Sequence, residues 1–299
     1  MSSAIHTENV ARIFGRVDAL KSLNLDVSEG SIYALVGPNG AGKTTAIKIL
    51  MNIIRPTNGI ATVLGVDSTR TTGRAFTAIG YVSENQKLPE WMRVDAFMAY
   101  LRPFYPSWDR DLENELVRQF DLPLNRKLKD LSRGMRMKAA LASSLAYHPQ
   151  LIVLDEPFSG LDPLVRDQLI EGLLARAAET TIFISSHDLA EVETFASHVG
   201  YLERGALQFS EEMTTLTDRF REVELTFETP PTLPEKWPDT WMLPTNTAVT
   251  VRFIESCFDA QRTEAEIHKI FSGLRDVSYA PMSLRSIFLA MAKAGRGAA

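Results

Sequence analysis

The chain has 299 residues, 45% of them hydrophobic and 23% charged, which is typical of a soluble globular protein with one large α/β domain and a smaller one. Its net charge of -5 argues against nucleic acid as the main partner. A single cysteine excludes an internal disulfide and indicates a reducing compartment, and no apolar run reaches the roughly 18 residues that would span a bilayer.

The first third of the sequence predicts strands followed by a helix. Leu23, Leu25 and Val27 alternate with polar residues, as in a half-buried strand. Residues 31–36 are almost continuously apolar, which is typical of a strand buried on both faces. A glycine-rich segment stops this strand, and residues 43–54 then have the pattern of a helix.

The middle of the chain, about residues 85–148, has a helical pattern throughout. Three helices are expected here, at residues 94–101, 110–120 and 136–147. Strand character returns at 151–154 and at 181–184, with a helix between them from about 164 to 178. The whole pattern is a βαβ arrangement that a helical insert interrupts.

The composition changes again near residue 229, where a proline-rich segment begins. Beyond this segment the sequence predicts alternating strands and helices, near 247–254, 262–271, 274–280 and 283–293. We therefore expect two domains. Residues 1–228 form the main α/β domain, with a helical subdomain at about 85–148, and residues 229–299 form a small α+β domain.

A phosphate-binding loop is indicated between the buried strand and the first helix. The pattern G-x-x-x-x-G-K-[ST] is matched by Gly37, Pro38, Asn39, Gly40, Ala41, Gly42, Lys43 and Thr44. In such a loop, glycines let backbone N–H groups surround a β-phosphate, and the helix N-terminus adds partial positive charge. Lys43 is expected to reach the β- and γ-phosphates, and the Thr44 hydroxyl to bind Mg²⁺. A glycine-rich turn with a chance Lys-Thr is the alternative, and the flanking strand and helix argue against it.

Two acidic residues follow the strand at 151–154. Ligands of α/β sheets bind at strand ends, so Asp155 is expected to hold Mg²⁺ through its water shell. Adjacent strand residues point to opposite faces, so Glu156 is expected to act differently, as the base that activates water near the γ-phosphate. His187 follows the next strand and is expected beside the same site, where it could bond the γ-phosphate. Two solvated acids and a structural histidine are the alternatives.

Together these residues resemble the nucleotide-binding subunit of an ABC transporter, over about residues 5–220. Gly37 to Thr45 match the family's Walker A loop, and residues 151–156 match Walker B. Residues 159–162 resemble the D-loop, and His187 resembles the switch histidine. The resemblance implies an α/β fold of the P-loop NTPase class, with a mixed sheet, an N-terminal antiparallel β part and a helical subdomain, here followed by the small C-terminal α+β domain.

The resemblance also assigns residues that the motif patterns leave unassigned. Phe14 stands where the family has an aromatic residue that stacks on adenine, and a buried strand aromatic is the alternative. Residues 131–135 occupy the place of the family signature, where a serine would add a hydroxyl and a glycine would let the backbone approach a phosphate. The implied nucleotide contacts beyond the loop are therefore Phe14, Thr45, Ser132, Gly134 and Asp162.

Two segments depart from the family pattern. The signature has Arg133 and Met135 where the family usually has Gly and Gln, and Glu84 stands where the Q-loop usually has Gln. A carboxylate at this position can still bind the metal or its water, and it adds negative charge that Mg²⁺ must offset. Two questions stay open at this point: whether Gln86 replaces Glu84 as the functional residue, and whether Arg133 faces a partner's nucleotide or is solvated.

The function implied by the resemblance is that of an ATP-hydrolysing subunit that uses Mg²⁺. Two copies of the chain, or one copy and a related ATPase, would enclose two ATP molecules and drive an integral membrane permease. Glu84 and the segments 104–109, 131–135 and 281–289 are similar to bacterial export-type ATPases.

The subunit would be cytoplasmic, held on the cytoplasmic face of the cell membrane by the permease. The permease would dock near residues 87–92, where Trp91 is either a contact or a core residue. The alternatives are a soluble ABC ATPase acting on ribosomes or DNA, and a P-loop kinase or GTPase. The sequence has one ATP domain, no long coiled-coil insert and no Asn-Lys-x-Asp motif, which argues against both.

Overall fold

The structure is a computed structural model that describes residues 2–297. The chain forms two compact units, which divide between Ser210 and Glu211. None of the helices within residues 2–297 combines the length and the hydropathy that a bilayer-spanning segment requires.

A six-stranded sheet forms the centre of the first unit, with the strand order β10-β9-β3-β8-β7-β6. Its strands are β3 (Ile32–Val36), β6 (Ile79–Ser83), β7 (Leu151–Asp155), β8 (Thr181–Ser186), β9 (His198–Glu203) and β10 (Ala206–Glu212). Strands β6, β7, β8, β3 and β9 pair in parallel. Every residue of β3, β7 and β8 is buried, which explains their continuous apolar runs. Parallel pairing brings the carboxyl ends of these strands to one edge.

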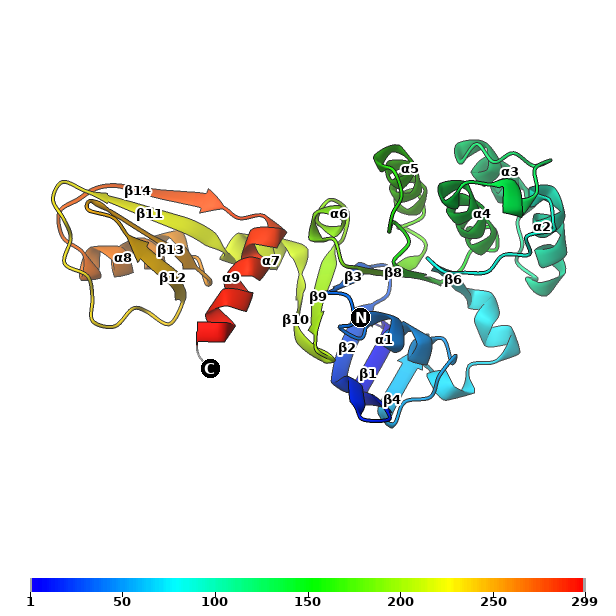
Figure 1. The fold of residues 1–299 in the computed structure, drawn as a ribbon, viewed down its shortest axis with the longest axis horizontal. Helices are drawn as coiled ribbons and strands as arrows, with labels where there is room; N and C mark the ends of the chain where they lie inside the picture. The colour runs from blue at the N-terminus through cyan, green and yellow to red at the C-terminus, as the bar shows by residue number, and fades with distance from the viewer. Residues whose placement is uncertain (1, 298–299) are drawn as a thin grey trace. The chain divides into compact units, whose positions relative to one another are not determined.

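A second, antiparallel sheet lies beside the first, with the order β2-β1-β4-β5. Its strands are β1 (Ser3–Phe14), β2 (Val17–Ser28), β4 (Asn58–Val63) and β5 (Val66–Asp67). Helix α1 (Lys43–Leu50) lies between the two sheets (Figure 1), and Ile47 packs in one buried cluster with Ile5 and Leu35. The helix ends before the predicted residue 54 because Asn52 adopts a left-handed φ of 52°.

The predicted helical insert is present as three helices that lie together in Figure 1: α2 (Val94–Leu101), α3 (Arg110–Gln119) and α4 (Arg133–Leu145). Helix α4 begins three residues before the predicted position. The Ser132 hydroxyl accepts a hydrogen bond from the Met135 N–H at 3.2 Å, so Ser132 is the N-cap of this helix. The signature segment, residues 131–135, therefore includes the cap and the start of the first helical turn. Short 3₁₀ turns connect other elements: η1 (Ser68–Arg70), η2 (Gly73–Ala78), η3 (Arg102–Phe104) and η4 (Leu128–Asp130).

Helix α5 (Pro163–Leu174) follows β7, and the short helix α6 (Leu189–Glu193) follows β8. Gly172 of α5 lies against Phe120, the C-cap residue of α3. A Cβ atom at Gly172 would lie 2.5 Å from Cζ of Phe120, so the missing side chain allows the two elements to approach closely.

The second unit is a four-stranded sheet in the order β12-β13-β11-β14, with helices. Its elements are α7 (Met213–Arg219), β11 (Arg221–Phe227), β12 (Trp241–Asn246), β13 (Thr250–Glu255), α8 (Ala260–Ile270), β14 (Leu274–Pro281) and α9 (Leu284–Gly297). Aromatic side chains dominate its core: Trp241 stacks on Phe253 with ring centroids 3.9 Å apart, and Phe271 packs in the same cluster.

The division between the units differs from the predicted boundary at 228/229. Strand β11 pairs with both β13 and β14, so it is an interior strand of the second unit. The proline-rich segment is therefore a loop within that unit and not a linker. Strand β12 was absent from the predicted elements because Pro244 interrupts its pattern, and its pairing shifts register between Met242 and Thr245. Proline is tolerated there because β12 is an edge strand.

Gly172→Ala is expected to lower the free energy of unfolding by up to about 2 kcal/mol. The new methyl group would meet the Phe120 ring, and overpacking costs about 1–3 kcal/mol, of which the better helix propensity of alanine offsets about 1 kcal/mol. Urea unfolding of this variant should be compared with Glu171→Ala, an exposed neighbour on α5. A gain in stability would show that Phe120 moves aside.

Candidate active site

The glycine-rich loop joins β3 to α1 at the edge where the parallel strands end. Gly40 and Gly42 have φ values of 80° and 113°, which favour glycine. A Cβ atom at Gly37 would lie 2.1 Å from the carbonyl oxygen of Leu202, and one at Gly42 would lie 2.5 Å from that of Ala19. Pro38 and its two following residues are exposed at the tip of the loop. The backbone therefore forms the open, glycine-dependent cradle that the motif predicts.

Lys43 directs a buried ammonium group into this loop. Its side chain is 5% exposed, and Nζ donates a hydrogen bond to the Gly37 carbonyl at 2.7 Å. Nζ also forms an ion pair with Oε1 of Glu156 at 3.0 Å. A buried cation in a glycine-rich loop at a helix N-terminus suits a phosphate, so the loop fits the phosphates of a nucleotide.

Thr44 and Asp155 lie side by side, as predicted for a metal site. The Thr44 hydroxyl donates to Oδ1 of Asp155 at 3.1 Å, and the Ser185 hydroxyl donates to the same oxygen at 2.7 Å. Burial raises the pKa of Asp155, and the hydrogen bonds from Ser185 and Thr44 lower it in part. Within residues 2–297, no three His, Cys, Asp or Glu side chains form a metal-binding group. A hydroxyl and a carboxylate fit Mg²⁺, which takes its other ligands from phosphate and water.

Glu156 links the loop to the histidine on the neighbouring strand end. Its Oε1 pairs with Lys43, and its Oε2 lies 2.7 Å from Nδ1 of His187. Glu156 has a left-handed φ of 52°, a conformation that costs about 1–2 kcal/mol for a non-glycine residue. This turn of the backbone sets the direction of the Glu156 side chain. Asp155 and Glu156 therefore point differently because β7 ends between them, and not because strand residues alternate, as the sequence predicted.

Phe14 is 45% exposed at the end of β1, so the interpretation as a buried strand aromatic is wrong. The guanidinium carbon of Arg12 lies 4.5 Å from the centroid of its ring. Cation–π contact of this kind shows that a face of the ring accepts a flat, electron-poor group. An adenine contact by Phe14 remains a prediction, as does a nucleotide contact by Thr45, which lies half-buried in the first turn of α1.

The other residues assigned by resemblance have structural partners in this chain. Ser132 caps α4, and Oδ1 of Asp162 caps α5 by accepting from the Val165 N–H at 3.1 Å. A Cβ atom at Gly134 would lie 2.8 Å from Cγ1 of Val165, so the absence of a side chain there allows α4 and α5 to pack. Their contacts with nucleotide stay predictions.

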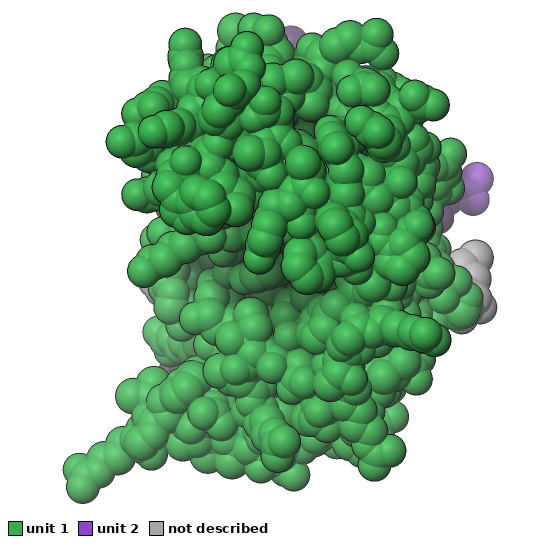
Figure 2. Space-filling view, turned by 90° about the vertical axis from the view of Figure 1, so that its right-hand side faces the viewer, with its two compact units in different colours: residues 1–210 green, residues 211–299 purple. Residues whose placement is uncertain are grey.

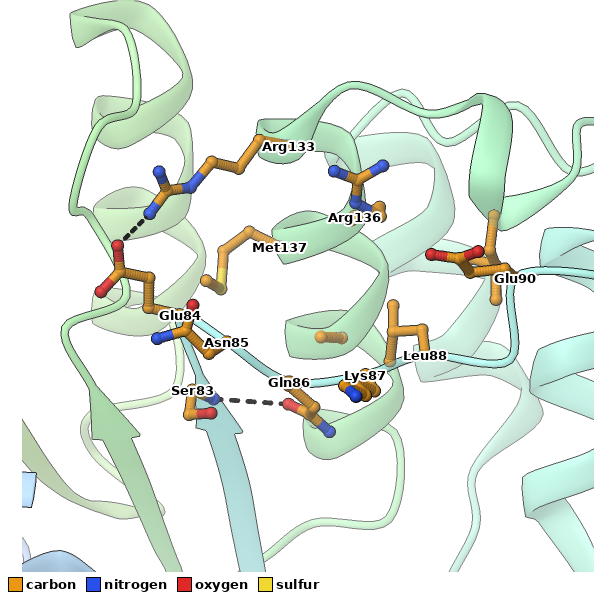
Figure 3. Close-up of a pocket in the computed structure, with 12 residues that line it drawn as sticks. Ser83, Glu84, Asn85, Gln86, Lys87, Leu88, Glu90, Arg133, Arg136 and Met137 are labelled. Carbon is orange, nitrogen blue, oxygen red and sulfur yellow. Dashed lines mark hydrogen bonds and ion pairs between the residues drawn. The ribbon is translucent and has the colours of Figure 1, made fainter.

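Glu84 lies at the end of β6, beside Asp155. Its N–H donates to the Asp155 carbonyl at 2.9 Å, and its side chain accepts from the Ser159 hydroxyl at 3.0 Å and pairs with Arg133. Figure 3 shows this pair at the mouth of a cavity of about 350 Å³. Gln86 instead accepts a hydrogen bond from the Ser83 N–H at 3.4 Å. Glu84 is therefore the residue next to Asp155, the predicted metal ligand.

Three contributors to the site were not singled out from the sequence: Ser185, Ser159 and Arg12. Ser185 is fully buried, bonds Asp155, and accepts from the Glu156 N–H at 3.0 Å. A serine at the end of an apolar strand just before His187 is the signal that could have identified it. The contact of Ser159 with Glu84 carries no such signal, because only the fold brings these residues together. Arg12 lies two residues before Phe14 in the same strand, so strand alternation could have indicated their contact.

The fold and the site define a P-loop nucleotide-binding protein. The family described as ABC transporter matches residues 20–159. The bacitracin transport ATP-binding protein BcrA of Enterococcus faecalis is 31% identical over 74% of this chain and 73% of its own length. The uncharacterized ABC transporter ATP-binding protein sll0415 of Synechocystis is 34% identical over 64% of this chain, which spans only 56% of that relative.

A bacterial ABC transporter cassette solved as a dimer has the same fold, with a TM-score of 0.63 and 24% identity over 70% of this chain and 98% of the cassette. The chain thus belongs to the ABC transporter family. The predicted fold class is confirmed, with its mixed sheet architecture and helical part.

Asp155→Asn is expected to raise the unfolding temperature of the nucleotide-free chain by about 2–4 °C near pH 7, which corresponds to about 1 kcal/mol. Burial raises the pKa of Asp155 above its unfolded value, so its contribution to stability is present at low pH and is lost as pH rises through the folded pKa. Asparagine keeps an acceptor for Ser185 without the buried charge.

Calorimetry between pH 4 and pH 8 checks this expectation. The gap between variant and wild type should be small near pH 4 and should widen toward neutral pH. The control is Asp18→Asn, at an exposed position in β2. A gap that does not change with pH would contradict the assigned cause.

Proposed function

We propose that this chain hydrolyses Mg²⁺-bound ATP between two ATPase subunits and so drives a membrane permease, with export as the direction of transport. The observation that carries this proposal is the chain of contacts from Lys43 through Glu156 to His187. It places a phosphate-binding cation, a carboxylate and a histidine at one edge of the sheet, which suits attack of a water molecule on a terminal phosphate.

The residues divide the work by their positions. The loop N–H groups and Lys43 bind and orient the phosphates, and Thr44 with Asp155 would hold Mg²⁺, which offsets phosphate charge when bound. Glu156 takes the proton of the attacking water, and His187 holds the second carboxylate oxygen in place. Lys43 and Glu156 are paired in the nucleotide-free chain, so a phosphate that engages Lys43 also frees Oε1 of Glu156 to accept that proton.

Two subunits are favoured because the chain carries two separate helix N-termini suited to anions. One is α1 with its loop, and the other is α4, which Ser132 caps. In the family the signature faces the nucleotide of the partner subunit, and a bacterial cassette of this fold forms a dimer. The partner would be a second copy of this chain or a related ATPase.

An exposed apolar region supports a permease partner. Trp91 is 72% exposed, so its interpretation as a core residue is wrong. The adjacent groove of about 510 Å³ is lined by Leu88, Pro89, Phe97 and Tyr100 among others. Figure 2 shows the first unit hollowed across the middle of one face. A membrane protein segment with an apolar face would fill such a groove and hold the chain at the cytoplasmic face of the membrane.

Export is favoured because segments 104–109, 131–135 and 281–289 are similar to export-type ATPases. The BcrA relative, which is named for bacitracin transport, matches most of this chain and is consistent with this direction. A soluble ABC ATPase that acts on ribosomes or DNA is not favoured, because the net charge of the chain is -5. Such a role would also leave Trp91 unexplained, which is the most exposed large apolar side chain of the described residues.

Glu156→Gln is expected to keep ATP binding, to lower the hydrolysis rate at least about 100-fold through loss of the general base, and to accumulate an ATP-bound dimer. Light scattering with Mg²⁺ and ATP should show twice the monomer mass. Lys43→Ala serves as the paired variant, because it should lose ATP affinity and stay monomeric. A Glu156→Gln chain that remains monomeric at saturating ATP would contradict the two-subunit site.

Trp91→Glu is expected to reduce recovery of the chain with native membranes by about tenfold or more, because a charge would enter the apolar docking surface. Quantitative blotting of washed membranes measures the change. Ile60→Glu, at an exposed position 57% accessible in β4, is the control for a new surface charge. Unfolding temperatures of both variants establish that the fold is kept, and equal membrane recovery would refute docking at Trp91.

A further inference from the structure

Two of the three residues that depart from the family pattern contact each other. Glu84 replaces the usual Q-loop glutamine, Arg133 replaces a signature glycine, and their side chains form an ion pair between the end of β6 and the start of α4 (Figure 3). The Ser159 hydroxyl donates to the same carboxylate oxygen, Oε1, at 3.0 Å. Two residues that lie 49 positions apart in the sequence, and that both differ from the family pattern, are therefore in contact in the fold.

The chemistry of the pair resembles that of the residue it replaces. A glutamine amide is neutral and presents one carbonyl acceptor and an NH₂ donor. Glutamate alone is negative and only accepts hydrogen bonds, while arginine alone is positive and only donates them. Joined together, they are neutral and offer both functions. Ser159 and Arg133 both engage Oε1, and among the described residues the structure gives Oε2 no partner.

The position of the pair directs this chemistry toward the site. The Glu84 N–H donates to the carbonyl of Asp155, so the backbone of Glu84 lies beside the residue that would hold Mg²⁺. The Glu84 side chain is 28% exposed, so a metal ion or its water can approach the carboxylate from solvent. A bare carboxylate here would add a second negative charge beside Asp155 and the phosphates, and Arg133 cancels it.

We propose that Arg133 is a positioning residue that acts through Glu84 in its own chain, so that the ion pair as a unit performs the metal-binding work of the family's glutamine. The proposal rests on the proposed function, because it concerns the same Mg²⁺ and ATP site. Arg133 neutralises the charge of Glu84 at that site, and a chain without Glu84 would not need Arg133 there.

This pairing predicts that one substitution suppresses the other. Arg133→Ala leaves an unneutralised carboxylate that repels the phosphates, and the dissociation constant for ATP at a fixed Mg²⁺ concentration should rise about tenfold, the loss typical of one charge-assisted contact. In the Glu84→Gln background the same Arg133→Ala change should shift it less than about twofold, because no carboxylate needs a partner. Arg133→Lys keeps the charge and should restore most of the wild-type value.

Arg136→Ala is the matched control. Arg136 lies one turn along α4 and lines the same cavity, yet its guanidinium donates to the Leu131 carbonyl at 2.9 Å and not to Glu84. It should show no suppression by Glu84→Gln.

Three measurements carry the test. Calorimetric titration of the full-length chain with a non-hydrolysable ATP analogue at several Mg²⁺ concentrations reports binding without turnover. Thermal unfolding of the metal-free and nucleotide-free chain reports the pair itself, where the shifts of the two single variants should not add up to that of the double variant. Steady-state kinetics should place the Arg133→Ala defect in KM for Mg²⁺-bound ATP more than in kcat.

Equal effects of Arg133→Ala in both backgrounds would overturn the proposal, as would a defect confined to kcat, which would assign Arg133 to the partner's nucleotide. The proposed function fails separately. It fails if the wild-type chain and Lys43→Ala are alike in ATP binding and hydrolysis, whereas an active wild-type chain with independent Glu84 and Arg133 effects rejects the pair alone.

Discussion

A buried lysine that needs an anion is the constraint on which the rest of the site depends. Lys43 is 5% exposed, at the start of a helix and inside a loop of N–H donors, where one positive charge meets several partial ones. In the nucleotide-free chain Glu156 supplies the compensating charge, and His187 holds Glu156 from the other side. In the proposed mechanism, a bound phosphate would take the place of Glu156 beside Lys43, so nucleotide binding would release the carboxylate that acts as the base.

The parallel sheet makes this arrangement possible. Strands β3, β7, β8 and β6 end at one edge, and their last residues deliver the loop, Asp155, Ser185 and Glu84 to neighbouring positions. Strands β3, β7 and β8 are buried on both faces, so a change in their order or register would expose apolar surface to water. The positive φ of Glu156 is the one local strain at this edge that changes where a functional side chain points.

The sequence predicted those parts of the site that local patterns specify. The loop motif located Lys43 and Thr44, and strand-end acids located Asp155 and Glu156, because each rests on a few adjacent residues between elements of clear periodicity. The start of α4 was misplaced, since the cap at Ser132 precedes the apolar pattern. The partners of Glu84 could not be predicted, because Arg133 and Ser159 meet it only through tertiary packing. The unit division was misplaced because prolines mark loops as well as linkers.

The place of β11 has a consequence for how the chain can be cut. A protein that ends at the proline-rich segment would keep β11 while losing β13 and β14, and would carry an unpaired strand with two open edges, a known route to aggregation. The remaining C-terminal piece would lack the strand that joins its two halves. A cut between Ser210 and Glu211 leaves each sheet's pairing almost whole. Any exchange of C-terminal units between related ATPases, in the laboratory or in evolution, is therefore expected to join ahead of β11.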